Sequence, residues 1–332
     1  MLIAFLGMIS LIAASGAQTP ATLPDVDRVR IVEAFRLADI LGNRVWPGWD
    51  KAPFAILLIT PDHEFLIRHP RPSDDFTLIG EDAVLKQKVW FRARKFEPNL
   101  LATFPAVGGV STIVIGQAEN TAAKTSTRWV ITLLHEHFHQ LQNSQPQYYA
   151  DVDALGLSRG DQTGMWMLNY DFPYDTPEVK DQFSAMCKAL AEALQAREQP
   201  NFAEKRAAYV EAKSKFQSLL KADDYKYFAF QVWQEGVARY TEYQVAELAA
   251  AEYQPTKEFQ ELKDYTSFKQ EADAILSGIE KELTSVQLDQ GKRVAFYALG
   301  AAEGLMLDRA NPEWRQRYFE DRFSLDTHFR SK

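Results

Sequence analysis

Apolar residues recur at two different spacings along the chain, and the change between them falls near Asn120. Before that point, short apolar runs are bounded by proline, glycine and aspartate, a pattern that predicts buried strands. These runs lie at residues 54–60, 64–68, 89–94, 101–106 and 111–116. One helix is expected earlier, at 28–41, where apolar residues follow the 3.6-residue period and Gly42-Asn43 end it.

After Asn120 the helical period dominates. Helices are expected at 125–141, 177–198, 203–221, 226–250, 257–286 and 290–309, and a loop-like segment rich in Tyr, Asp and Gly separates the first two. Strands followed by helices predict an α+β fold, with a small N-terminal β-sheet and a mainly helical C-terminal body. We expect residues 18–143 to form the α/β region and residues 144–332 the helical region.

The N-terminus has the pattern of an export signal. Residues 2–14 are an apolar run, and the small residues Ser15, Gly16 and Ala17 follow it. This predicts a signal peptide over residues 1–17 and an exported protein, periplasmic or secreted. Because no Lys or Arg precedes the run, an uncleaved anchor or a misassigned start is the alternative. No later stretch is apolar enough to span a bilayer, so no stable membrane insertion is expected after cleavage.

Composition excludes some classes of function. The chain is 46% hydrophobic and 25% charged, as in ordinary globular proteins. Its net charge of -8 argues against nucleic acid as a partner, because nucleic-acid binding requires a basic face. The single cysteine, Cys187, excludes an internal disulfide and is expected to be a small buried hydrophobe rather than a nucleophile.

The chemistry centres on residues 134–141, Leu-His-Glu-His-Phe-His-Gln-Leu. On a helix, His135 and His139 lie on one face about 5–6 Å apart at Cβ, so both imidazoles can bind one zinc ion. Glu136 lies beside that face and can take a proton from a zinc-bound water and pass it to a leaving amine. The pattern therefore predicts a zinc site with Glu136 as general base, while His137 points away from it.

A catalytic zinc needs a third protein ligand, and the best candidate is Glu235. It lies in the polar stretch Gln-Glu-Gly of an otherwise apolar helix, where Gly236 allows another backbone to approach closely. The alternative is a partly solvated helix in which Glu235 pairs with Arg239 at i+4. Glu242 is the second candidate for the ligand.

His135-Glu136-x-x-His139 with a downstream Glu on a second helix resembles the gluzincin branch of the zincin metallopeptidases. The resemblance covers about 15 residues around each motif. It implies a zincin-like fold, two His and one Glu as zinc ligands, and Glu136 as general base. It also implies a strand edge that holds the peptide extended, for which residues 111–116 are expected. Arg239 departs from the pattern, because some members have there an acidic residue that orients a ligand histidine.

The resemblance also implies a Tyr or His from the helical body that stabilises the oxyanion of the reaction. Tyr297 is the first candidate and Tyr240 the second, and for each the alternative is a packed aromatic side chain. Glycines spaced four apart, Gly300 and Gly304, predict close helix packing near Tyr297.

The predicted function is that of an exported zinc-dependent metallopeptidase acting on peptide or protein substrates. The alternative is a non-catalytic zinc- or partner-binding protein on a zincin-like scaffold, although such a protein would have no need of Glu136. A third hypothesis makes the histidines accidental, and it predicts that His135, His139 and Glu235 lie far apart.

Overall fold

The structure is a computed structural model that describes residues 21–329. It consists of a six-stranded β-sheet and a larger set of helices, so the predicted α+β class is confirmed. Among the described residues, no helix is long and apolar enough to cross a membrane. The predicted signal peptide, residues 1–17, lies outside the described part of the chain.

The sheet has the strand order β3-β4-β2-β1-β6-β5. Its strands are β1 (Ile56–Ile59), β2 (His63–Ile67), β3 (Thr77–Asp82), β4 (Gln87–Ala93), β5 (Leu101–Val107) and β6 (Val110–Gly116). β1 and β6 are parallel and the other neighbours are antiparallel. The five predicted strands are present. β3 was not predicted, because it lies at the sheet edge with mostly exposed residues and no buried alternate face.

One sequence-based expectation about the sheet is wrong. Residues 111–116 were expected to be a free edge, but β6 lies between β1 and β5 and uses its backbone on both sides. The turn at Gly108-Gly109, where both φ angles are positive, folds β5 back onto β6 and makes β5 the edge. Pro105 fits this position, because proline has no backbone N–H to donate and is tolerated on edge strands.

Both faces of the sheet are covered by apolar side chains. Successive side chains in a strand point to opposite faces, so a strand buried on both faces is apolar at every position. In β1, Ile56 and Leu58 join the main core beneath the helices. Leu57 and Ile59 join a smaller core on the other face, with Val114 of β6. The four residues of β1 are therefore all buried, which explains their continuous apolar run.

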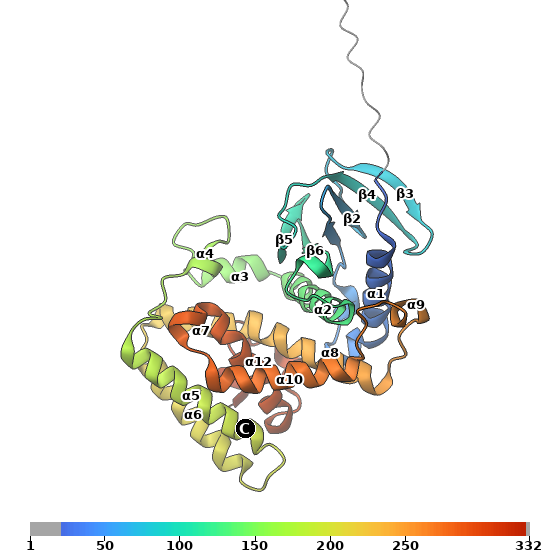
Figure 1. Ribbon diagram of the computed structural model, residues 1–332. Coiled ribbons are helices and arrows are strands. Elements are labelled where there is room, and N and C mark those ends of the chain that lie inside the picture. Colours follow the sequence, from blue (N-terminus) through green and yellow to red (C-terminus); the bar gives the residue numbers. More distant parts are fainter. Residues whose placement is uncertain (1–20, 330–332) are drawn as a thin grey trace, which may run out of the picture.

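Helix α2 (Ser126–Asn143) lies between the sheet and the helical body, with α1 (Asp25–Val45) beside it (Figure 1). It packs against β5 and β6 on one side and α8 on the other. Sixteen of its residues are buried, which makes it the central element of the molecule. Side chains on α2 can therefore meet groups from both the sheet and the helical body.

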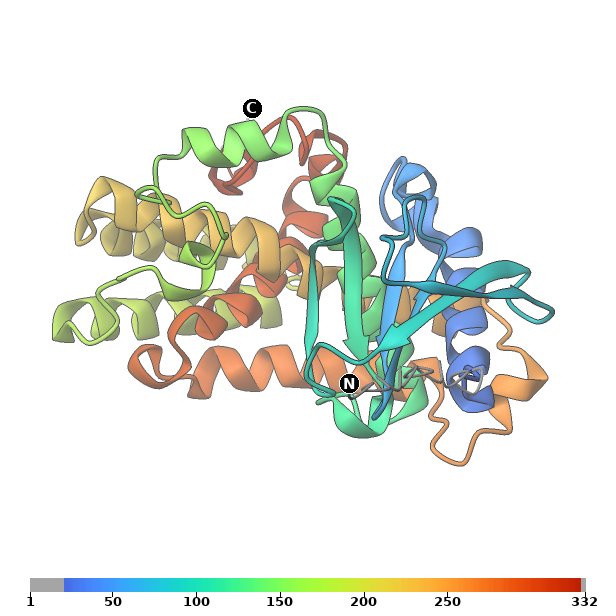
Figure 2. The same cartoon turned by 90° about the horizontal axis from the view of Figure 1, so that it is seen from above.

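The helical body follows α2. Its helices are α3 (Tyr148–Ala154), α4 (Trp166–Asn169), α5 (Pro177–Gln195), α6 (Phe202–Ser218), α7 (Ala222–Gln231), the π-helical η3 (Val232–Gly236), α8 (Val237–Glu252), α9 (Lys257–Gln260), α10 (Phe268–Ser285), α11 (Leu288–Gly291), the 3-10 turn η4 (Lys292–Val294), α12 (Ala295–Ala310) and α13 (Trp314–Arg317). The pair α5 and α6 lies on the side of the molecule away from the sheet (Figure 2).

Four predicted segments are divided differently, and one of them, the helix expected at 290–309, consists of the end of α11, the turn η4 and α12. The helix expected at 226–250 is α7, a π-helical turn and α8, and the one expected at 257–286 is interrupted before α10. Ser267 forms a capping box with Gln270 there, which starts α10 as a new helix. The loop expected at 144–175 contains the short helices α3 and α4.

Candidate metal centre

His135 and His139 lie one turn apart on α2, and their imidazoles face each other. Their Nε2 atoms are 3.2 Å apart, and both side chains are nearly buried. The other ring nitrogens are occupied elsewhere, because His139 Nδ1 lies 2.7 Å from Gln142 Oε1 and His135 Nδ1 lies 2.8 Å from Glu242 Oε1. Two imidazole nitrogens held at this separation suit a shared cation between them.

Glu136 completes a buried group with the two histidines. One potential ligand atom from each of His135, Glu136 and His139 lies within 4.8 Å of the others, so this group could hold a metal ion. The Thr103 hydroxyl of β5 donates to Glu136 Oε2 over 2.7 Å. That contact fixes the carboxylate and joins the sheet edge to the site.

Glu235 approaches the same pair of nitrogens from the helical body. Its Oε2 lies 3.5 Å from His139 Nε2 and 3.9 Å from His135 Nε2. Ligand atoms of a tetrahedral zinc with bonds of ~2.0–2.1 Å are separated by roughly 3.4 Å. The spacing of the three atoms is thus close to that of a two-His, one-Glu zinc site, and such a donor set suits zinc. The alternative pairing with Arg239 is absent, since that guanidinium lies 2.6 Å from Glu282.

The backbone that carries Glu235 is the π-helical turn η3 between α7 and α8. A π turn inserts an extra residue into the helix and changes the direction of its side chains, and it is frequent at functional sites. Gly236 and Gly300 make this turn possible, because a Cβ added at Gly236 would lie 2.5 Å from the Gly300 Cα. The close packing predicted from the glycine spacing is confirmed, and Gly304 likewise packs against the Tyr240 ring.

The charges of the cluster depend on one another. Burial alone would raise the pKa of Glu235, but His139 and His135 lower it to about 2. Burial alone would lower the pKa of His139, but Glu235 raises it to about 9. Without a metal ion, the site is therefore held together by an anionic Glu235 and a protonated His139. A divalent cation would replace that proton.

Glu242, the second candidate for the ligand, contacts the outer nitrogen of His135 instead of the shared space. Its other oxygen, Oε2, lies 2.7 Å from Arg128 Nη2. Burial would raise the pKa of Glu242, but Arg128 and His135 lower it to about 2, so the carboxylate is anionic. Glu242 thus holds the outer nitrogen of His135 from α8, seven residues beyond Glu235.

The two tyrosine candidates lie in different surroundings. Tyr297, on α12, is within reach of Glu235. Burial, and to a smaller extent the negative charge of Glu235, raises the pKa of Tyr297 well above its usual value. Its hydroxyl also accepts a hydrogen bond from Arg293 Nη1. Tyr240 instead donates to the Asp308 carboxylate over 2.8 Å, away from the cluster. Of the two, only Tyr297 is near the candidate ligands.

Other singled-out residues have structural roles. His137 stacks on Phe54 with ring centroids 3.8 Å apart, and burial lowers its pKa to about 3, so it is a core histidine as expected. Cys187 is buried, also as expected. Sequence reasoning missed Thr103, Gln142, Arg128 and Arg293. Of these, Gln142 could have been found from its i+3 spacing to His139.

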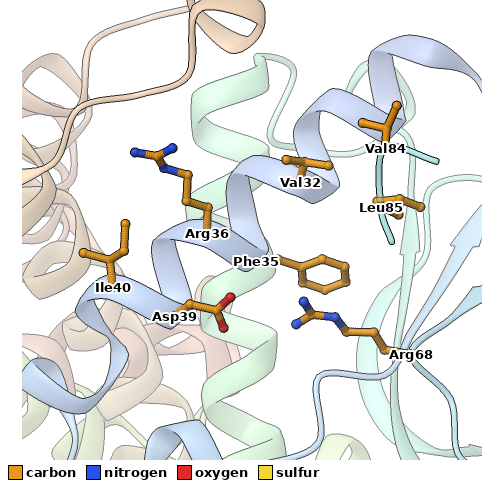
Figure 3. Close-up of a pocket in the computed structure, with 8 residues that line it drawn as sticks. All are labelled: Val32, Phe35, Arg36, Asp39, Ile40, Arg68, Val84 and Leu85. Atoms are coloured by element: carbon orange, nitrogen blue, oxygen red, sulfur yellow. The ribbon is translucent and has the colours of Figure 1, made fainter. Parts of the chain in front are cut away.

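A separate hollow of about 540 Å³ lies between α1 and the sheet (Figure 3). The Arg68 guanidinium lies 3.5 Å from the centroid of the Phe35 ring there, and Asp39 lines the same space. None of the residues that line this hollow belongs to the histidine cluster. It brings no metal-binding group together, so it is not the candidate reaction site despite its size.

No family model, curated protein or solved structure matches the chain. The function must therefore be argued from the geometry of the cluster itself.

Proposed function

We propose that this chain is an exported, zinc-dependent metallopeptidase of the gluzincin type that hydrolyses peptide or peptide-like amide bonds. The observation that supports it best is the convergence of Glu235 Oε2 with the Nε2 atoms of His135 and His139, within 3.9 Å, beside Glu136. These groups come from two elements that are far apart in the sequence. That is the opposite of what the accidental-histidine hypothesis predicts.

His135, His139 and Glu235 would hold the zinc ion. Bound zinc supplies Lewis acidity toward water and toward the carbonyl of the cleaved bond. Glu136 takes a proton from the attacking water and returns it to the amine as the C–N bond breaks and the new C–O bond forms. The Thr103 hydroxyl holds one oxygen of Glu136 in place for both transfers. Tyr297 is the candidate donor to the oxyanion.

The free edge of β5 is the surface on which a peptide would lie. An extended peptide can add as a further strand to an exposed sheet edge. β5 is such an edge, and its Thr103 contacts Glu136 directly. A peptide paired there would pass beside the general base, so β5 takes the place that residues 111–116 were expected to have.

Metal content and turnover test this proposal together. After incubation with zinc and removal of the excess, wild type should retain one zinc per chain by mass spectrometry, and H135A should lose it. Wild type should cleave members of a broad peptide library, whereas Glu136→Gln should keep the zinc and lose cleavage. Glu280→Gln, an exposed change on α10, is the matched control and should behave as wild type.

Two results would contradict the proposal. If wild type does not retain one zinc per chain, the chain has no metal centre of the proposed kind. Stoichiometric zinc without any cleavage, in a protein whose Glu136 is intact, favours the non-catalytic zinc-binding alternative.

A further inference from the structure

Arg293 places a positive charge next to the candidate metal centre. It lies in the 3-10 turn η4, directly before α12, and is half-buried. Its Nη1 donates a hydrogen bond to the Tyr297 hydroxyl, and the negative charge of Glu235 raises the pKa of both groups. The preceding residue, Lys292, has a positive φ of 48° where α11 ends and η4 begins.

Within the described part of the chain, no carboxylate forms a direct ion pair with Arg293. Five other arginines that are buried or half-buried each reach a carboxylate within 3.2 Å, namely Arg30, Arg92, Arg128, Arg239 and Arg322, whereas among residues 21–329 the half-buried Arg68 and Arg206 form no ion pair. Among residues 21–329, Arg293 forms no ion pair within 4.0 Å, and its hydrogen-bond partner is a neutral phenol. Burial would lower its pKa, but Tyr297 and Glu235 raise it, so the guanidinium stays charged. A guanidinium in this state suits an incoming anion.

We propose that Arg293 binds a carboxylate of the substrate and thereby sets the specificity of the enzyme. This inference rests on the proposed peptidase function. Arg293 contacts the Tyr297 hydroxyl, and the Glu235 carboxylate raises the pKa of both groups, so the guanidinium lies near the candidate ligand Glu235. The carboxylate therefore lies close to the cleaved bond, either at the peptide C-terminus or on an acidic side chain.

An arginine serves this purpose better than a lysine would. Its planar fork donates two parallel hydrogen bonds to a carboxylate, and its contact with Tyr297 holds that fork in place. A peptide lying along β5 would then be anchored at one end by Arg293 and positioned at the other by the sheet edge. Short peptides, or the ends of longer ones, are the expected substrate class.

The test measures binding and not turnover. The zinc-loaded Glu136→Gln protein is titrated calorimetrically with Ala-Phe-Ala as the free acid, with its C-terminal amide, and with Ala-Phe-Glu amide. The free acid should bind roughly 10- to 100-fold more tightly than the amide, as charge-assisted hydrogen bonds predict. Adding Arg293→Gln should remove the preference, Arg293→Lys should leave part of it, and Arg206→Gln on α6 should leave it intact.

The peptide amide with the glutamate side chain separates the two sources of the carboxylate. If it binds as tightly as the free acid, Arg293 accepts an acidic side chain as well as a C-terminal carboxylate. If it alone binds tightly, the side chain is the anion that Arg293 binds. If it binds as weakly as Ala-Phe-Ala amide, the anion is the C-terminus. Equal binding of all three peptides to the protein with Arg293 intact would overturn the inference. So would a preference that survives Arg293→Gln.

A failure of this inference can be distinguished from a failure of the proposed function. Acid preference in a protein that never cleaves peptides would leave the Arg293 site standing and remove the peptidase. Cleavage without a preference for the free acid would support the peptidase and remove the Arg293 site. Zinc content is measured for each variant first, and it should stay at one per chain because Arg293 is not a ligand. A variant that lost zinc would be replaced by Arg293→Lys for the comparison.

Discussion

At the scale of single residues, the two histidines are oriented by what their outer nitrogens contact. Gln142 holds His139 from the same helix, and Glu242 holds His135 from α8. Arg128, seven residues before His135 on α2, forms an ion pair with Glu242. Both Nε2 atoms thereby point into the space between the rings. The two rings lose their rotamer freedom when the chain folds, so a metal ion that binds there would not have to order them.

Glu242→Gln should weaken zinc binding by roughly 10- to 100-fold, because outer partners fix the ring and raise the basicity of a ligand histidine. A glutamine keeps the size of the side chain but removes its charge. The dissociation constant is measured by competition with a chromophoric chelator. Glu282→Gln is the control, since it removes a carboxylate paired with Arg239 on the neighbouring surface. An unchanged zinc affinity in Glu242→Gln would show that the contact with His135 has no orienting role.

The stability of the zinc-free protein should fall as pH rises from about 6.5 to 9. The pKa of His139 is about 9 in the folded chain against an ordinary 6.5. Between these values the folded state keeps a proton that the unfolded state releases, so stability falls by up to about 1.4 kcal/mol per pH unit. The measurement is urea unfolding in the presence of a chelator at a series of pH values.

The control for this slope is Glu235→Gln, which removes the group that raises the pKa of His139. The difference in free energy of unfolding between wild type and this variant should vanish above pH 9 and be largest below pH 6.5. With saturating zinc the slope should reverse, because protons compete with the metal for the same nitrogens. A zinc-free wild type whose stability is the same at pH 6.5 and pH 9 would contradict the Glu235–His139 pairing.

At the scale of elements, the π-helical turn decides where Glu235 points. The turn is held against α12 at two glycines, where a Cβ on Gly300 would lie 2.6 Å from the Val232 carbonyl oxygen and 2.7 Å from the Gly236 Cα. Both neighbours are backbone atoms that cannot rotate away. Any added side chain must therefore separate the two elements.

Gly300→Ala should destabilise the fold by roughly 1–3 kcal/mol, as overpacking does, and should weaken zinc binding by moving η3. The matched control is Gly278→Ala on α10, whose added Cβ would meet only Arg239 Nη2 at 3.6 Å. That change should be neutral or slightly stabilising, because alanine favours helix. Thermal unfolding and chelator competition measure the two effects. Equal behaviour of the two variants would mean that the glycine contact does not position Glu235.

The sequence was informative where one local pattern determines one element. Buried strands and long helices follow from apolar periodicity, and the spacing of His135 and His139 already places both rings on one helix face. The edge position of β5, the π turn and the role of Glu242 did not follow, because each depends on which distant segment packs alongside. Gly236 was the only local sign of the turn, and it indicated close approach without naming Gly300 as the partner.

At the scale of the whole molecule, two buried polar features lie in different parts of the structure. The cluster of His135, His139 and Glu235 joins α2 to η3, whereas a buried ion network in the helical body joins Lys213 to Glu303 and to Asp326 at 2.7 Å each. Glu303 is fully buried, and it also accepts a hydrogen bond from Tyr209. The two features share no residue, so their contributions to stability can be separated.

Zinc should raise the thermal midpoint of wild type by roughly 5–10 °C when it is present at a thousandfold excess over its dissociation constant. Binding only to the folded state adds about 4 kcal/mol under that condition, and a large domain shifts by a few degrees per kcal/mol. Calorimetric scans with zinc and with chelator measure the increment. Glu235→Gln should lose most of it, because one of the candidate ligands is gone.

Lys213→Met provides the contrast at this scale. Removing the cation leaves Glu303 and Asp326 buried without a counter-charge, which costs about 3–5 kcal/mol and should lower the midpoint with and without zinc. The zinc increment should nevertheless stay as large as in wild type, since the cluster is untouched. If Lys213→Met abolished the increment, the metal centre would depend on the ion network, and the two would form one cooperative unit. If wild type showed no increment at all, the cluster would not be a metal centre.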